Sequence, residues 1–213
     1  MNKAKVSTIL KCENLLGESC FWDPRYNCLV WTDIEAKKAW MLDDNNQSFV
    51  FNLPDRAGFI LPRKKEGFII GFPNFIAISD KNFSSFEKIC EVEITNNQTR
   101  INDAKVDPYG GIVFGTYNED PDKAKRKPIA NLYRLAPNLS LTHLLSNITV
   151  SNGIAFSENE NIMYFADTPT GRIQKFEYTK NFNKFYELEA NMIFKNVGEP
   201  DGATVCLLYT SPS

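Results

Sequence analysis

Histidine is almost absent from the sequence, because His143 is the only one in 213 residues. A Ser-His-Asp or Cys-His hydrolase needs an imidazole beside its nucleophile, and a zinc site built from histidines needs more than one. Residues 141–145 read as an outer strand, so we expect His143 to have a structural role. The sequence therefore argues against a hydrolase site with a catalytic histidine and against a zinc site built from several histidines.

Cysteine pairs, long apolar runs and an excess of charge of one sign are missing as well. The five cysteines are odd in number and lack Cys-x-x-Cys spacing, so disulfides are not expected. No apolar run approaches the length of a membrane span, and residues 1–10 lack the apolar core of a signal peptide. The formal net charge of −2 gives no reason to expect nucleic acid or a membrane as partner. We expect a cytoplasmic location, and the oligomeric state stays open.

Short apolar runs separated by polar turns are what the sequence does contain. Hydrophobic residues make up 43% of the chain and aromatic residues 13%, which favours an all-β protein. In residues 151–178, apolar runs at 153–156 and 162–167 are followed by an alternating run at 172–178. Gly, Pro and Asn separate these runs, which is typical of an antiparallel meander.

The same strand–turn–strand pattern recurs along the chain. Its turns begin at Asp23, Pro62, Asp107 and Ser157, at intervals of roughly 40–50 residues, which is the period of a β-propeller blade. The repeats are assigned to residues 17–43, 49–88, 100–145 and 150–194, with an opening strand at 5–15 and the start of a fifth repeat at 198–203.

Four repeats and one further strand cannot close a ring, because sheet edges and core would be left open. We therefore expect residues 1–205 to form a single partial β-propeller domain. Residues 206–213 do not continue the pattern, and we interpret them as a non-native tail. Residues 118–128 are a polar insertion in the third repeat, which is either a lid over the channel mouth or a solvated loop.

The repeat spacing also selects three polar residues. Glu18, Asn102 and Asn152 each lie five positions before the turn residue of their own repeat. Equivalent positions in a propeller point to equivalent places, so we expect these side chains to converge at one end of the central channel. The alternative for the two asparagines is a turn role in which the amides cap backbone groups, and Glu18 has the alternative of an exposed loop carboxylate.

Five motifs in order resemble one family. They are Gly-Glu followed by Phe-Trp-Asp at 17–23, Arg-Ile-Asn-Asp-Ala-Lys-Val-Asp-Pro at 100–108, Ala-Asn-Leu-Tyr-Arg-Leu at 130–135, Ser-Asn-Gly at 151–153 and Pro-Asp-Gly at 200–202. Over residues 12–203 the chain resembles the SMP-30/gluconolactonase group, which includes regucalcin. Asn131 departs from the pattern, since many members have a small Gly there, and the family usually continues beyond the Asp-Gly by about a blade and a half.

The resemblance implies a six-bladed β-propeller, with about four blades and the start of a fifth in this chain, and one divalent metal on the channel axis. By the family pattern, Glu18, Asn152 and Asp201 would be the metal ligands, and Arg100 and Asn102 would bind the substrate. Two carboxylates and an amide oxygen suit Ca²⁺, Mg²⁺ or Mn²⁺, and Zn²⁺ stays open.

The chemistry implied is the hydrolysis of a sugar lactone, gluconolactonase-like or pentonolactonase-like, to its aldonic acid by metal-activated water. Asp201 would then be the catalytic base. For Arg100 we favour binding of sugar hydroxyls over stabilisation of the negative charge on the carbonyl oxygen. The alternative is that Arg100 only pairs with a nearby acid. Asp103 is interpreted as a structural residue or as one that supports the metal ligands, rather than as a ligand itself, and Trp22 and Trp31 are interpreted as core residues. The alternatives to a lactonase are a non-catalytic calcium-binding or interaction propeller and a related propeller esterase.

Overall fold

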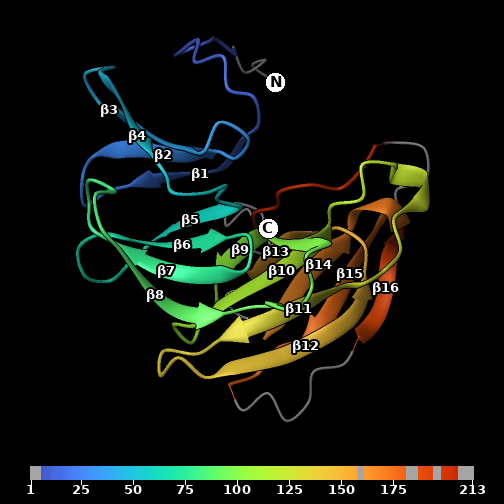
Figure 1. Cartoon of the computed structure of the whole chain (residues 1–213). Helices are drawn as coiled ribbons and strands as arrows, with labels where there is room; N and C mark the ends of the chain where they lie inside the picture. The colour runs from blue at the N-terminus through green and yellow to red at the C-terminus, as the bar shows by residue number, and fades with distance from the viewer. Residues whose placement is uncertain (1–5, 158–160, 181–186, 194–197, 206–213) are drawn as a thin grey trace, which may run out of the picture.

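The computed structural model describes residues 6–157, 161–180, 187–193 and 198–205, and the backbone alone at 189–193 (Figure 1). The expected tail at 206–213 lies outside the described residues. The described part of the chain forms four antiparallel sheets of four strands each, which we call blades, and two single-turn 3-10 helices. It contains no helix long and apolar enough to cross a membrane.

Each blade is built from consecutive strands. The first contains β1 (Gly17–Asp23), β2 (Cys28–Asp33), β3 (Lys38–Asp43) and β4 (Ser48–Asn52). The second contains β5 (Phe59–Pro62), β6 (Phe68–Phe72), β7 (Phe75–Ser79) and β8 (Phe86–Glu91). The third contains β9 (Thr99–Val106), β10 (Ile112–Asn118), β11 (Ala130–Leu135) and β12 (Leu141–Ile148), and the fourth contains β13 (Ser151–Ser157), β14 (Ile162–Asp167), β15 (Arg172–Glu177) and β16 (Glu187–Ile193). The 3-10 helices are η1 (Lys123–Lys125) and η2 (Thr168–Thr170).

The blades lie side by side in an arc, with the first strand of each near the middle and the fourth at the outside (Figure 1). This arrangement confirms a β-propeller with four blades. One boundary was wrong, because β4 belongs to the first blade and not to the second repeat. The reason is a tight turn between β3 and β4. The backbone N–H of Asp43 donates to the carbonyl of Gln47, and Asn46 adopts a positive φ of 61°. This turn reverses the chain, so that β4 pairs with β3.

The expected opening strand is also wrong, because residues 6–15 contain no strand. This segment is held instead by the carboxylate of Asp33, which accepts backbone hydrogen bonds from Leu15 (3.1 Å), Leu16 (3.0 Å) and Ala36 (3.4 Å). Burial raises the pKa of Asp33, but these bonds outweigh it and hold the pKa below its usual value. No strand occurs at residues 198–205 either, so the described part of the chain shows no fifth blade.

The core lies between blades rather than inside any one of them. Three clusters of buried apolar side chains fill the three interfaces between neighbouring blades. In the first interface the rings of Phe68 and Phe83 stack with centroids 4.8 Å apart. Each blade is therefore stabilised by its neighbours, as in other repeat architectures.

Buried ionic clusters join the blades as well. Asp107, at the turn after β9, accepts hydrogen bonds from Arg134 Nε (2.6 Å) and from the Tyr178 hydroxyl (2.7 Å). Its other oxygen accepts from the backbone N–H groups of Tyr109 and Gly111, both at 2.8 Å. This cluster joins the turn of the third blade to the residue that follows β15 in the fourth blade.

Asp23 has the corresponding role between the first two blades. Its buried carboxylate pairs with Arg25 at 2.5 Å. The same guanidinium donates to the backbone carbonyls of Arg63 (2.5 Å), Lys65 (2.6 Å) and Gly67 (3.2 Å) in the second blade. In both blades the aspartate at the turn after the first strand therefore takes part in contacts that join the blade to the next one.

Candidate functional site

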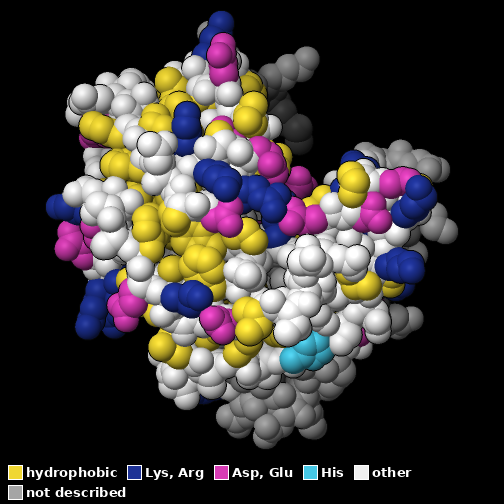
Figure 2. Space-filling view, in the orientation of Figure 1, with side chains coloured by type: hydrophobic (Ala, Val, Ile, Leu, Met, Phe, Trp, Pro, Cys, Tyr) yellow, Lys and Arg dark blue, Asp and Glu magenta, His cyan; other side chains and the backbone are white. Residues whose placement is uncertain are grey.

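All five residues expected at the site line one cleft. Its volume is about 1200 Å³, and it is bordered by the inner strands β1, β5, β9 and β13 and by the segment at 199–204. Figure 2 shows the molecule hollowed on this side, with acidic and basic side chains gathered beside the hollow. The five are Glu18, Arg100, Asn102, Asn152 and Asp201. The structure brings them together, and their roles stay predictions.

Bulges in three of the inner strands, β1, β9 and β13, lie at or beside four of these residues. Strand pairing slips after Glu18 in β1 and after Asn152 in β13, and in β9 it slips across Asn102 and Asp103. Bulges turn side chains out of the regular alternation and are common beside functional sites. The equal spacing assumed for the three residues was wrong by one position in the third blade. The turn after β9 is one residue longer than the turns after β1 and β13, so Ile101 is the structural counterpart of Glu18, and Asn102 lies within the bulge.

The two asparagines are joined to each other. Asn102 donates through Nδ2 to the Asn152 side-chain oxygen (3.1 Å) and to the Ser151 carbonyl (2.9 Å). Asn152 donates through its own Nδ2 to the Thr168 hydroxyl (2.8 Å), which donates to the carbonyl of Pro200 (2.8 Å). These bonds fix the amide of Asn152 with Oδ1 toward Asn102 and leave one lone pair of that oxygen free. Neither amide merely caps its own turn.

Carboxylates crowd one end of the cleft. Burial raises the pKa of Glu18, and the negative charges of Asp201 and Asp103 raise it further. Burial also raises the pKa of Asp103 to about 6, despite hydrogen bonds from the backbone of Ile154 and Ala104. Asp103 lines the cleft, as a residue that supports the metal ligands would, and carboxyl groups with raised pKa values are common at functional sites.

This end of the cleft fits a divalent cation. Glu18 is half-buried beside two other carboxylates, and a cation would offset the repulsion among them. Among the described residues no three His, Cys, Asp or Glu side chains could hold a metal by themselves, so the amide oxygen of Asn152 is needed in the set. Oxygen donors of this kind suit hard cations.

Arg100 forms the neighbouring wall. Only 6% of this residue is exposed, and burial lowers its pKa. Its Nη1 donates to the carbonyl of Ile101 (3.0 Å) and to the side-chain oxygen of Asn102 (2.8 Å), while the guanidinium lies 4.6 Å from the Tyr117 ring centroid. Glu119 Oε1 lies 3.4 Å from Arg100 Nε, which nevertheless makes no hydrogen bond.

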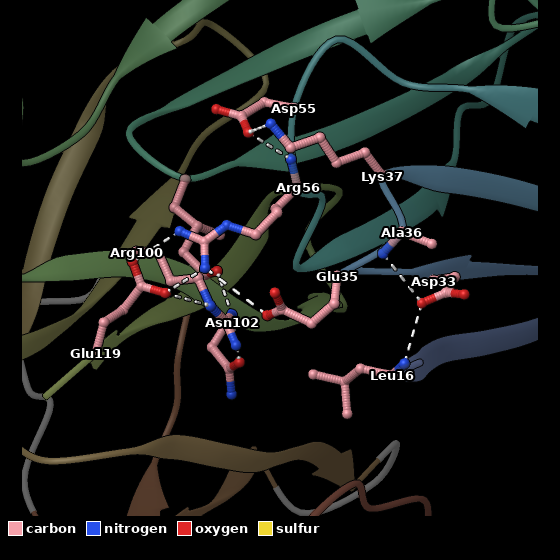
Figure 3. Close-up of polar contacts among 11 residues, drawn as sticks. Leu16, Asp33, Glu35, Ala36, Lys37, Asp55, Arg56, Arg100, Asn102 and Glu119 are labelled. Carbon is pink, nitrogen blue, oxygen red and sulfur yellow. Dashed lines mark hydrogen bonds and ion pairs between the residues drawn. The ribbon is translucent and has the colours of Figure 1, made fainter. Parts of the chain in front are cut away.

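Glu119 is mainly held by a different arginine. Arg56 binds both of its oxygens, at 2.6 and 2.9 Å, and lies 3.7 Å from Glu35 (Figure 3). This network joins the linker between the first two blades to the third blade. Glu119 thus pairs with both arginines, and Arg100 also lines the cleft, so both interpretations of Arg100 stay predictions.

Comparison with known proteins identifies the family. The sequence profile described as the SMP-30/Gluconolactonase/LRE-like region matches residues 16–206. The chain belongs to this family. It is 29% identical over 214 residues to regucalcin from Danio rerio, a match that covers 96% of this chain and 69% of regucalcin. It is 30% identical over 195 residues to L-arabinolactonase from Azospirillum brasilense, covering 90% of this chain and 64% of that protein.

A solved structure supports the fold of this SMP-30/gluconolactonase family member. The luciferin-regenerating enzyme superposes with a TM-score of 0.84 at 25% identity, and the match covers 90% of this chain and 66% of that one. The chain thus spans about two thirds of the length of the relatives it matches.

Lys123, Arg126 and Trp22 also line the cleft, although the sequence did not select them individually as site residues. Lys123 and Arg126 of the 118–128 insertion line the cleft, which places this loop at the cleft wall as the lid interpretation requires. Trp22 lines it too, and at 50% exposed it is not the core residue expected, whereas Trp31 is buried and stacks on Trp40. Trp22 follows the β1 bulge, and no composition signal distinguishes it from a core tryptophan.

His143 lies away from the cleft, on the outer strand β12. Its Nε2 contacts both the Asn131 side-chain oxygen (3.2 Å) and the Ser146 hydroxyl (3.1 Å). A catalytic triad uses the two ring nitrogens separately, so this arrangement does not form one. Asn131 also donates to Glu93 (2.5 Å) and is not among the residues that line the cleft.

Proposed function

We propose that this protein hydrolyses a sugar lactone to its aldonic acid in a metal-dependent reaction. The proposal is supported above all by one cleft that gathers Glu18, Asn102, Asn152 and Asp201 from different parts of the chain beside Arg100. The name L-arabinolactonase of one relative supports the same class of substrate. We further propose that residues 1–205 form one propeller domain and that the complete ring has six blades.

Glu18, Asn152 and Asp201 are the residues that would hold the metal, which is Ca²⁺, Mg²⁺, Mn²⁺ or Zn²⁺. When bound, the metal would supply Lewis-acid polarisation of the lactone carbonyl and make water more acidic. The bond network from Asn102 through Asn152 to Thr168 fixes the orientation of the Asn152 amide before any ligand arrives. Such preorganisation is what a binding site of defined geometry requires.

The chain's own groups account for substrate binding and proton transfer. Asp201 accepts the proton of the attacking water at a carboxylate oxygen. The water oxygen bonds to the lactone carbonyl carbon, the ring C–O bond breaks, and the released ring oxygen takes the proton from Asp201, which leaves the open-chain aldonic acid and returns Asp201 to its carboxylate form. Arg100 donates to sugar oxygens, and Asn102 accepts from a sugar hydroxyl at Oδ1, because both hydrogens of its Nδ2 are already engaged.

The test is acid release from D-glucono-1,5-lactone and L-arabinono-1,4-lactone, measured with a pH indicator after removal of metal with a chelator. Activity should return with one of the four cations. Glu18→Gln should lower the metal-dependent rate by at least about 100-fold, since it removes a charged ligand. Glu87→Gln is the matched control, because Glu87 is exposed on β8 and remote from the cleft.

Each result has a distinct meaning. Cation binding without acid release from any lactone would favour a non-catalytic calcium-binding propeller. Hydrolysis of aryl esters but not lactones would favour an esterase. Equal loss of rate in Glu18→Gln and Glu87→Gln would refute the ligand assignment.

A further inference from the structure

Arg126 is held in a fixed position at the cleft wall. Its Nε donates to the backbone carbonyl of Asp120 (2.7 Å), and its guanidinium lies 4.8 Å from the ring centroid of Tyr117. Within the described parts of the chain it forms no ion pair with an acid. A half-buried guanidinium that is already oriented but has no carboxylate partner is a ready site for an anion.

Two further cations line the same cleft. Arg100 packs on the same Tyr117 ring, at 4.6 Å, and its buried Nε lacks a hydrogen bond. Lys123 lines the cleft from the same loop as Arg126 and lies 3.9 Å from Glu199. One tyrosine ring therefore carries two guanidiniums that both line the cleft.

Contacts between side chains order the cleft wall from acidic to basic. Asn152, beside the carboxylate end, is bonded to Asn102, which is bonded to Arg100. Arg100 packs on Tyr117, and Tyr117 packs on Arg126. A ligand whose carbonyl lies at the Asn152 end would thus extend its far end toward the two guanidiniums.

We propose that this basic end binds an oxyanion substituent of the substrate, a carboxylate, sulfonate or phosphate carried outside the lactone ring. The identification of the substrate as a lactone rests on the proposed function, but the anion preference rests on the cations alone. Arg126 selects the substituent because a guanidinium donates two parallel hydrogen bonds to such a group. It is a specificity-determining residue, separate from the groups assigned to hydrolysis.

The test is calorimetric binding of D-glucose 6-phosphate and D-glucose to the full chain, in a buffer without phosphate or sulfate. Neither sugar has a lactone carbonyl, so binding is measured without turnover. The unsubstituted chain should bind the sugar phosphate at least about tenfold more tightly than the neutral sugar. Arg126→Gln should abolish that preference, and Arg126→Lys, which keeps the charge but not the paired donors, should retain part of it.

Lys127→Gln is the matched control, because it removes one positive charge from the same loop at a side chain that does not line the cleft. It should leave the preference within about twofold, since only a remote charge is lost. No binding of the sugar phosphate, equal affinity for both sugars, or equal losses in Arg126→Gln and Lys127→Gln would overturn the proposal. Lactone hydrolysis without anion preference would overturn this inference alone, and anion preference without hydrolysis would overturn the proposed function alone.

Discussion

Replacing Tyr178 by phenylalanine removes one buried oxygen from the interface between the third and fourth blades. Tyr178 is 1% exposed, and its hydroxyl donates to Asp107 at 2.7 Å. A hydrogen bond to a charged group contributes about 1.5–3 kcal/mol. Phenylalanine keeps the buried ring. Asp107 keeps Arg134 and two backbone donors, and Arg134 Nε loses its weaker acceptor, the Tyr178 hydroxyl at 3.2 Å, but keeps Asp107. The loss should therefore lie at the lower end, about 1.5–2 kcal/mol.

Urea unfolding measures this loss. With a slope of about 2–3 kcal/mol per M for a chain of this size, the midpoint should fall by about 0.5–1 M. Tyr164→Phe is the matched control, because Tyr164 lies in the same blade and its hydroxyl makes no hydrogen bond to the described residues. All three tryptophans lie in the first blade, so fluorescence reports that blade while circular dichroism reports every sheet.

The two signals also test whether the blades unfold together. If unfolding is cooperative, Tyr178→Phe shifts both signals equally. If only circular dichroism shifts, the fourth blade separates from the rest before the first blade unfolds. A midpoint shift no larger than that of Tyr164→Phe would refute the energetic role assigned to the Asp107 cluster.

Three other substitutions test the fold and the site. Gly115→Ala places a methyl group 1.8 Å from the Ser151 hydroxyl and should cost about 1–3 kcal/mol in urea unfolding, part of which Ser151→Gly should restore; full stability would show that the sheet yields there. Asn152→Ala should weaken binding of Ca²⁺ or Mn²⁺ by about tenfold or more in calorimetry, and unchanged affinity would exclude the amide as a ligand. Asp33 has a pKa below its usual 3.8, so its stabilising contribution is complete above pH 3.8 and disappears as the pH falls through the lower folded value. Asp33→Asn should therefore be less stable at pH 7 but lose less stability between pH 4 and pH 2, and parallel pH profiles for the two proteins would contradict this.

The blades were predictable because short strands and turn residues follow local rules. The convergence of Glu18 and Asn152 was predictable for the same reason, since equal spacing within equal repeats gives equal positions. The third repeat broke the rule through one additional turn residue, which shifted the register at Asn102. The length of a turn can vary from repeat to repeat, and the alternation of residues within the strands does not predict it.

Contacts between distant segments were not predictable. The pairing of Arg56 with Glu119 joins residues far apart in the sequence, and either side chain had other possible partners. The position of Arg126 depends on the path of a polar loop, and loop sequences with many charges do not define one path. Whether Trp22 faces the core or the cleft depends on the bulge in β1, and the alternation of polar and apolar residues along the strand does not reveal that bulge.

The distribution of the cleft residues over separate blades has a mechanical consequence. Glu18 belongs to the first blade and Asn152 to the fourth, and these two sheets share no strand pairing in the described structure. A ligand held by both therefore acts as a cross-link that closes a long loop of chain, which opposes separation of the outermost blades. Its binding should slow amide hydrogen exchange in outer strands that it never touches.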